Sequence, residues 1–140
     1  TLTLRLSGAE SEVAAAERRL APESATADVG FWADLREHRL PFFDDDGPLW
    51  RLSVPAHVPP LPLAGETFLD WGGAQRWYRG EAAADVIRAA AAASGGHATL
   101  FRGPPGIGRG HPLPGTAARL QERIRRAFDP HDILNRPAEP

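Results

Sequence analysis

Alternating hydrophobic and polar positions predict several β-strands in this chain. In residues 49–54, Trp50, Leu52 and Val54 fall on one side, and Arg51 and Ser53 fall on the other. Successive side chains of a strand point to opposite faces, so this pattern is typical of a strand with one buried face. The same alternation occurs in residues 1–6 and 97–102 and in both halves of residues 68–79.

The two halves of residues 68–79 form a predicted hairpin around Gly72-Gly73. Glycine takes a positive φ without a steric clash, so a Gly-Gly pair between apolar runs indicates a tight turn. With this pair as the loop, Trp71 faces Ala74, and Glu66 faces Arg79. One face of the hairpin then carries Phe68, Asp70, Gln75 and Trp77, and the other carries Leu69, Trp71, Ala74, Arg76 and Tyr78.

Helical spacing predicts four helices, at residues 9–21, 28–40, 81–94 and 116–127. Their apolar stripes include Val13, Leu35, Val86 and Ile124, and we expect Leu120 and Ile124 of the last helix to be buried. Five strands and four helices in this order predict a single α+β domain over residues 1–140. It has a mainly antiparallel sheet with helices packed on one face.

Such an arrangement leaves one face of the sheet uncovered. We expect that face to present a polar and basic set of side chains, joined by one face of the hairpin. The set consists of Arg5, Arg51, Ser53, His97 and Thr99.

Composition narrows the class of protein. The 140 residues include no Cys, so neither a disulfide framework nor a thiolate metal site is available. The 16 basic residues are all Arg, yet the net charge is −2, which argues against binding nucleic acid. The apolar runs are too short for a membrane span, so we expect no direct membrane insertion.

Three clusters resemble reactive sites without matching their spacing. Asp44-Asp45-Asp46 lacks the alternating ligands of a calcium loop, which favours a solvated turn. The loop 103–110 lacks the ending of a phosphate-binding loop and does not open a helix, which favours a flexible loop. His97 and His111 stand without a neighbouring carboxylate, so we expect no metal site.

Four motifs carry a resemblance to a known family. They are DWGGAQRW at Asp70 to Trp77, GGHATLFR at Gly95 to Arg102, HPLP at His111 to Pro114 and FDPHDILN at Phe128 to Asn135. Together they resemble the E subunits of bacterial glycolate oxidase, which are FAD-linked oxidases. The resemblance implies that the chain is the C-terminal, ferredoxin-like cap domain. The N-terminal flavin-binding domain of the family has no counterpart here.

The family resemblance also implies an activity. The intact protein would contain FAD and belong to a complex that oxidises glycolate, or a similar 2-hydroxy acid, to the 2-oxo acid. Its partners would be a flavin domain, a D-type flavin subunit and an iron-sulfur subunit that passes electrons to a membrane acceptor. We expect a cytoplasmic complex, peripheral at the inner membrane, and a 140-residue chain that by itself carries no FAD and no activity.

A cap over a flavin needs cations for the substrate carboxylate. We expect substrate contact from Arg51, Arg76 and Arg102, with His97 as a hydrogen-bond partner or base. The residues expected to face the flavin are Ser53, Asp70 and Gln75.

Two other functions fit the same sequence. The chain suits a non-catalytic ferredoxin-like module for binding or oligomerisation, since a fold does not fix a function. It equally suits a structural E subunit beside a catalytic D subunit.

Overall fold

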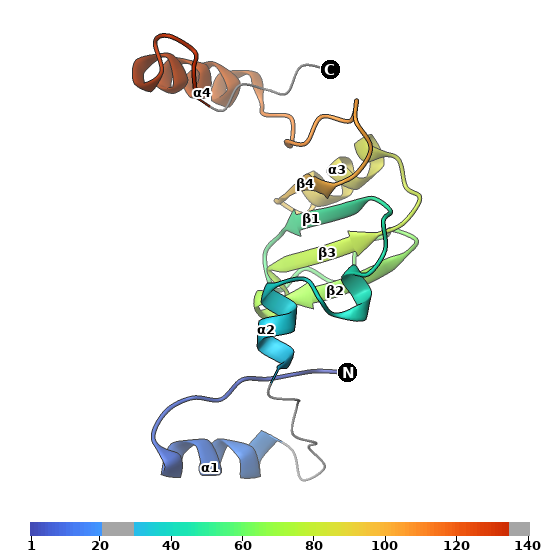
Figure 1. Cartoon of the computed structure of the whole chain (residues 1–140), viewed down its shortest axis with the longest axis vertical. Helices are drawn as coiled ribbons and strands as arrows, with labels where there is room; N and C mark the ends of the chain where they lie inside the picture. The colour runs from blue at the N-terminus through green and yellow to red at the C-terminus, as the bar shows by residue number, and fades with distance from the viewer. Residues whose placement is uncertain (21–29, 135–140) are drawn as a thin grey trace. The chain divides into compact units, whose positions relative to one another are not determined.

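A computed structural model describes residues 1–20 and 30–134 of the chain (Figure 1). These residues belong to two compact units, which span residues 1–44 and 45–140. The helix end predicted at Ala21, the helix start predicted at Asp28 and the tail beyond Leu134 lie outside the described residues.

The first unit contains helices α1 (Glu10–Leu20) and α2 (Phe31–Arg36) and a 3₁₀ turn at Pro41–Phe43. The strand predicted at residues 1–6 is wrong, because no strand forms there and the side chain of Leu2 is 80% exposed. An alternating pattern gives a segment an apolar face. A strand also needs a neighbouring strand for its backbone hydrogen bonds, and the pattern does not supply one. Arg5 therefore does not belong to the sheet.

The second unit contains the sheet. Its strands are β1 (Leu49–Ser53), β2 (Glu66–Asp70), β3 (Gln75–Arg79) and β4 (His97–Arg102). They lie in the order β2-β3-β1-β4, and every neighbouring pair is antiparallel (Figure 1). This confirms the α+β class and the antiparallel sheet, with four strands where the sequence predicts five.

The strand order contains two interlocked crossovers. Strands β1 and β2 run parallel with β3 between them, and β3 and β4 run parallel with β1 between them. Helix α3 (Ala84–Ala93) links the second pair, while an irregular connector at residues 54–65 links the first. The result is a ferredoxin-like double split β-α-β arrangement in which this connector takes the place of one helix.

One face of the sheet holds the hydrophobic core. Trp50, Leu52, Tyr78 and Leu100 are at most 2% exposed, and Ile87 of α3 is completely buried against them. Val58, Leu61 and Leu63 of the connector pack on the same cluster. We call this side the covered face.

Two side chains of β3 donate hydrogen bonds to the backbone of the connector. These bonds replace those that a helix would form within itself. Arg76 is 4% exposed and donates hydrogen bonds to the carbonyl oxygens of Val58 and Pro59, the latter at 2.8 Å. The hydroxyl of Tyr78 donates to the carbonyl of Ala64 at 2.7 Å. An irregular segment leaves carbonyl groups that a helix would satisfy internally, and these two residues supply the missing donors.

The hairpin has the predicted register, from Glu66 opposite Arg79 to Asp70 opposite Gln75. Gly72 and Gly73 both have positive φ, 63° and 92°, as the turn requires. The pairing stops one residue earlier than predicted, because Trp71 itself has a φ of 50° and leaves the strand. Its backbone N–H is held by the carboxylate of Asp70 at 2.8 Å.

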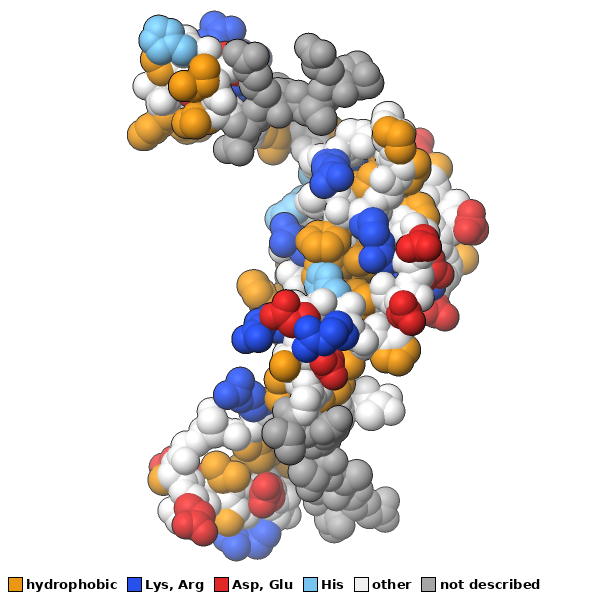
Figure 2. All heavy atoms as spheres, viewed as in Figure 1, with side chains coloured by type: hydrophobic (Ala, Val, Ile, Leu, Met, Phe, Trp, Pro, Cys, Tyr) orange, Lys and Arg blue, Asp and Glu red, His pale blue; other side chains and the backbone are white. Residues whose placement is uncertain are grey.

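The helices cover less of the sheet than their spacing predicts. In α3, Ile87 and Ala91 are buried as the inner stripe, but Val86 is 50% exposed. In α4 (Gly115–Phe128), no residue is buried, and Leu120 and Ile124 are 55% and 50% exposed. The prediction that these two are buried is therefore wrong for the described chain. Hydrophobic side chains are visible at the surface of the α4 segment in Figure 2.

None of the described helices is long and apolar enough to cross a membrane.

Candidate functional site

The face of the sheet opposite the core, which we call the open face, brings five of the predicted site residues together. Strand register places Asp70, Gln75, Ser53 and His97 side by side in one row across all four strands. Directly opposite residues in a sheet have Cβ atoms about 5 Å apart, so this row is continuous. A parallel row on the same face contains Phe68, Trp77, Arg51 and Thr99.

Arg51 lies at the centre of the open face. It is exposed and lies between Trp77 on β3 and Thr99 on β4. Its guanidinium has no hydrogen-bond or ion-pair partner within residues 1–20 and 30–134. A central arginine without a carboxylate is a ready site for an anionic group, because a guanidinium binds a carboxylate with two parallel hydrogen bonds.

The neighbouring row contains both donors and acceptors. The carboxylate of Asp70 accepts the backbone N–H of Trp71 at 2.8 Å and the side-chain amide of Gln75 at 3.3 Å. Ser53 and His97 complete the row, and both are exposed. This half of the open face can therefore both donate to and accept from a planar polar ligand.

Aromatic side chains adjoin Arg51. The ring of Trp77 is 4% exposed and meets the ring of Phe101 edge-on, with the centroids 5.1 Å apart. Phe68 lies opposite Trp77 on the edge strand β2. A cation beside a packed aromatic cluster therefore combines a positive charge with an apolar surface that is easily desolvated.

The other two predicted arginines occupy different environments. Arg76 lies on the covered face, where its donors hold the connector and the carbonyl of Gly73. Arg102 lies at the end of β4 and donates to the backbone carbonyl of Asp45. Both are thereby attached to the protein's own backbone, in contrast to Arg51.

Asp45 contacts two strands of the sheet, which the predicted solvated turn does not require. Its carboxylate pairs with Arg79 of β3, while its carbonyl receives Arg102 of β4. The backbone N–H of Gly47, followed by the nearby charge of Arg79, lowers the pKa of Asp45 below its usual value. The three Asp residues give no local signal for this role, because both arginines are distant in sequence.

The two histidines of the earlier motifs lie close to each other. The rings of His97 and His111 have centroids 6.3 Å apart. The Nδ1 atom of His111 accepts the backbone N–H of Ala98 at 3.3 Å, so this lone pair is occupied. No group of three metal-ligating side chains occurs in the described part of the chain.

The glycine-rich loop at residues 103–110 is anchored at its far end. Arg88 of α3 donates to the carbonyl of Gly108, and its guanidinium lies 5.2 Å from the ring centre of Trp50. The carbonyl of Arg109 accepts the N–H of Leu100 at 2.9 Å. The loop does not open a helix, so it offers no helix N-terminus to a phosphate.

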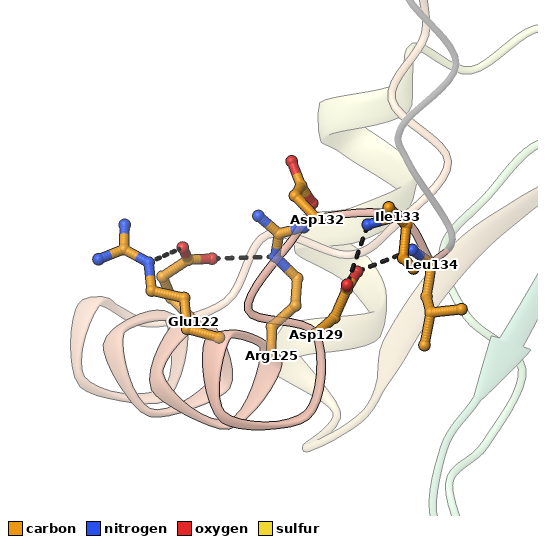
Figure 3. Close-up of polar contacts among 7 residues, drawn as sticks. Glu122, Arg125, Asp129, Asp132, Ile133 and Leu134 are labelled. Atoms are coloured by element: carbon orange, nitrogen blue, oxygen red, sulfur yellow. Dashed lines mark hydrogen bonds and ion pairs between the residues drawn. The ribbon is translucent and has the colours of Figure 1, made fainter.

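The end of α4 has its own network of polar contacts (Figure 3). Glu122 pairs with Arg125 and Arg126, at 3.2 and 2.7 Å. Asp129 accepts the backbone N–H groups of Ile133 and Leu134 at 2.9 and 2.7 Å, and these hydrogen bonds lower its pKa. Thus part of the FDPHDILN motif is a capped turn, which agrees with the predicted helix stop before Pro130.

Comparison with known proteins supports the motif resemblance. The chain is 40% identical over 134 residues to glycolate oxidase subunit GlcE of Escherichia coli (strain K12). The match covers 96% of this chain and 37% of that protein, so the chain spans little more than a third of the relative's length. No family model matches the chain, and no solved structure matches it. The identity across nearly the whole chain confirms the resemblance to glycolate oxidase E subunits.

Proposed function

We propose that this chain is the C-terminal cap of a glycolate-oxidase-type subunit, with its open face over flavin and substrate. The observation that carries the proposal is Arg51, an exposed arginine without a partner in the described residues, at the centre of a sheet face. The similarity to GlcE over 96% of the chain supports the class of enzyme.

In this proposal the protein groups bind and orient the substrate. Arg51 holds the carboxylate of a small 2-hydroxy acid. His97, at the β4 end of the neighbouring row and diagonal to Arg51, is a hydrogen-bond partner or base. Trp77 and Phe101 exclude water from one side of Arg51. Arg76 and Arg102 keep the face in position through the connector and the Asp45 turn.

The flavin is proposed to be held mainly by a separate domain. The described residues supply no glycine turn at the start of a helix for its phosphates, since the loop at 103–110 runs along β4. Ser53, Asp70 and Gln75 are suited to polar contact with a planar ring system. FAD, when bound, supplies the hydride-accepting chemistry.

The exposed stripe of α4 favours a role in assembly as well. Leu120, Ile124 and Phe128 are 50% to 83% exposed along one helix. Exposed apolar stripes of this kind mark interaction surfaces. We propose that this stripe seats the cap on the flavin domain, in a complex with a D-type flavin subunit and an iron-sulfur subunit peripheral to the inner membrane.

The test uses the intact subunit in its complex, with glycolate and an artificial electron acceptor. Arg51→Ala is expected to lower kcat/KM by about 10- to 100-fold, mostly through KM, since a charged hydrogen-bond pair contributes roughly 1.5–3 kcal/mol. Arg51→Lys should recover part of the loss. Arg19→Ala, which removes an exposed arginine of α1, is the matched control and should leave the kinetics unchanged.

Unchanged kinetics in Arg51→Ala would contradict the substrate role. Equal losses in Arg51→Ala and Arg19→Ala would indicate a general effect of removing a surface arginine instead. Inactivity of the complex without any E subunit, combined with full activity of Arg51→Ala, would favour the structural-subunit alternative.

A further inference from the structure

The two edges of the sheet differ in how their backbone groups are satisfied. On the outer edge of β4, the N–H groups of Ala98 and Leu100 point away from β1. His111 Nδ1 accepts the first at 3.3 Å, and the carbonyl of Arg109 accepts the second at 2.9 Å. The segment at 109–111 therefore closes this edge.

Within residues 45–134, no segment pairs with the outer edge of β2 in this way. Hydrogen-bonding direction alternates along a strand, so Glu66, Phe68 and Asp70 face β3, and Thr67 and Leu69 turn their N–H and carbonyl groups outward. Among residues 45–134, no backbone group bonds to those outward groups of Thr67 and Leu69. Thr67 is exposed, and the side chain of Leu69 is 58% exposed. An edge of this kind is a template for another strand.

The side chains around this edge give it a defined chemistry. Leu69 and the 76% exposed Trp71 provide apolar contacts beside the strand. Glu66 and Asp70 lie at the two ends of the strand, on its other face. The carboxylate of Glu66 is 3.9 Å from the guanidinium of Arg79, which also pairs with Asp45. Its negative charge is therefore only partly neutralised by Arg79.

A second copy of the chain is a poor occupant. Antiparallel pairing of β2 with itself over all five residues is centred on Phe68, and it puts Glu66 opposite Asp70 twice. Like charges directly opposite each other destabilise a sheet. Shifting the register by two residues removes this conflict but leaves pairs among only three of the strand residues.

We propose that the β2 edge binds an extended segment of another polypeptide, in which basic residues alternate with apolar ones. The segment adds a fifth, antiparallel strand through the outward groups of Thr67 and Leu69. Its basic side chains lie opposite Glu66 and Asp70, and its apolar side chains lie beside Leu69 and Trp71. This surface does not include Arg51 or His97, the proposed substrate contacts, but it shares Asp70 with the residues proposed to face the flavin.

The probe is a capped peptide, Thr-Arg-Val-Thr-Val-Arg-Thr, added to the isotopically labelled 140-residue chain. Its Arg residues are placed opposite Asp70 and Glu66. Nuclear magnetic resonance should show shifts at the amides of Thr67 and Leu69, with slower exchange of both. The same peptide with Glu in place of Arg should bind about tenfold more weakly or worse, because two opposite-charge pairs become like-charge pairs.

Two blocks test the backbone contact. Thr67→Pro removes an outward donor at an edge, where proline is tolerated, and should abolish binding. N-methylation of both peptide Val residues should do the same without changing the protein, so the test does not depend on the folding of the variant.

Several outcomes would overturn the proposal. They are no shifts at millimolar peptide, equal binding of the Glu peptide, or unchanged binding after N-methylation. Slow exchange of Thr67 and Leu69 in the full-length protein without peptide would show that its own chain occupies the edge. A dimer that Thr67→Pro abolishes would make a second copy the occupant.

Discussion

Helices α3 and α4 have similar apolar spacing and different surroundings. In α3, Ile87 and Ala91 are 0% exposed, and both contact the covered face of the sheet. In α4, Leu120 and Ile124 repeat the spacing, yet both are at least half exposed. Spacing thus predicts that a helix has an apolar stripe but does not predict what the stripe contacts.

The regions around the two helices differ in the same way. The sheet, α3 and the connector pack around one core, and side chains of β3 also hold the connector. The segment from α4 to Leu134 is organised by local contacts, those of Glu122 and Asp129. We therefore expect the sheet region to unfold cooperatively and the α4 segment to respond locally.

The largest expected difference is between two isoleucines. Ile87→Ala should destabilise the chain by about 2–5 kcal/mol, because it opens a cavity in a packed core. Ile124→Ala should change the free energy of unfolding by no more than about 0.5 kcal/mol, since its side chain is half exposed. Urea denaturation of both variants measures this contrast. Equal losses would show that α4 is packed like α3.

A smaller effect is expected within the hairpin turn. Gly73→Val should cost about 1–3 kcal/mol, because its φ is 92° and a Cβ atom would lie 3.3 Å from the carbonyl of Ala56. Gly72→Val should cost less, as its Cβ atom meets nothing within 4 Å. Thermal unfolding of the pair measures the difference. The reverse ranking would show that space around the turn does not decide the cost.

The cap at the end of α4 should give a local effect. Asp129→Ala removes the acceptor for the N–H groups of Ile133 and Leu134, so their amide exchange should become faster. The amide of Leu100, in the sheet, should keep its exchange rate. A loss of protection throughout the sheet would mean that the two regions unfold together. His131→Ala is a neighbouring control, because this exposed side chain accepts neither of these hydrogen bonds.

The smallest effect is a pH dependence. The pKa of Asp45 is lowered in the folded chain, so its contribution is present above the usual aspartate pKa and is lost as pH falls through the folded value. Acid should therefore weaken the ion pair between the Asp45 carboxylate and Arg79 before it affects the core. An Asp45→Asn variant should show a flatter stability profile below about pH 4. Identical profiles would remove Asp45 from the acid response.

Much of the sheet was predictable because its information is local. The Gly72-Gly73 pair predicts the register of β2 with β3, and the alternation in 49–54 and 97–102 predicts two more strands with Arg51, Ser53 and His97 on one face of the sheet. The pairings of β1 with β3 and with β4 join segments distant in sequence and were not predicted. Parity could not place Arg76, since either hairpin face could have met the core. Its burial depends on the carbonyl groups of a connector about 17 residues away.

Other contacts had no signal in the sequence. The roles of Asp45, Arg88 and His111 depend on partners that are brought close only by the fold. The strand predicted at 1–6 failed for the opposite reason, because a strong local pattern met no neighbouring strand.

The hydrogen bonds from Arg76 fix the backbone path of the connector more than they fix its amino-acid sequence. Its guanidinium binds the main-chain oxygens of Val58 and Pro59, which every amino acid possesses. Residues along the connector are therefore free to change wherever their side chains do not enter the core. Adding or deleting a residue between β1 and Val58 would shift those oxygens relative to Arg76. Lysine could not replace the arginine, because its single ammonium cannot span the same fork of acceptors.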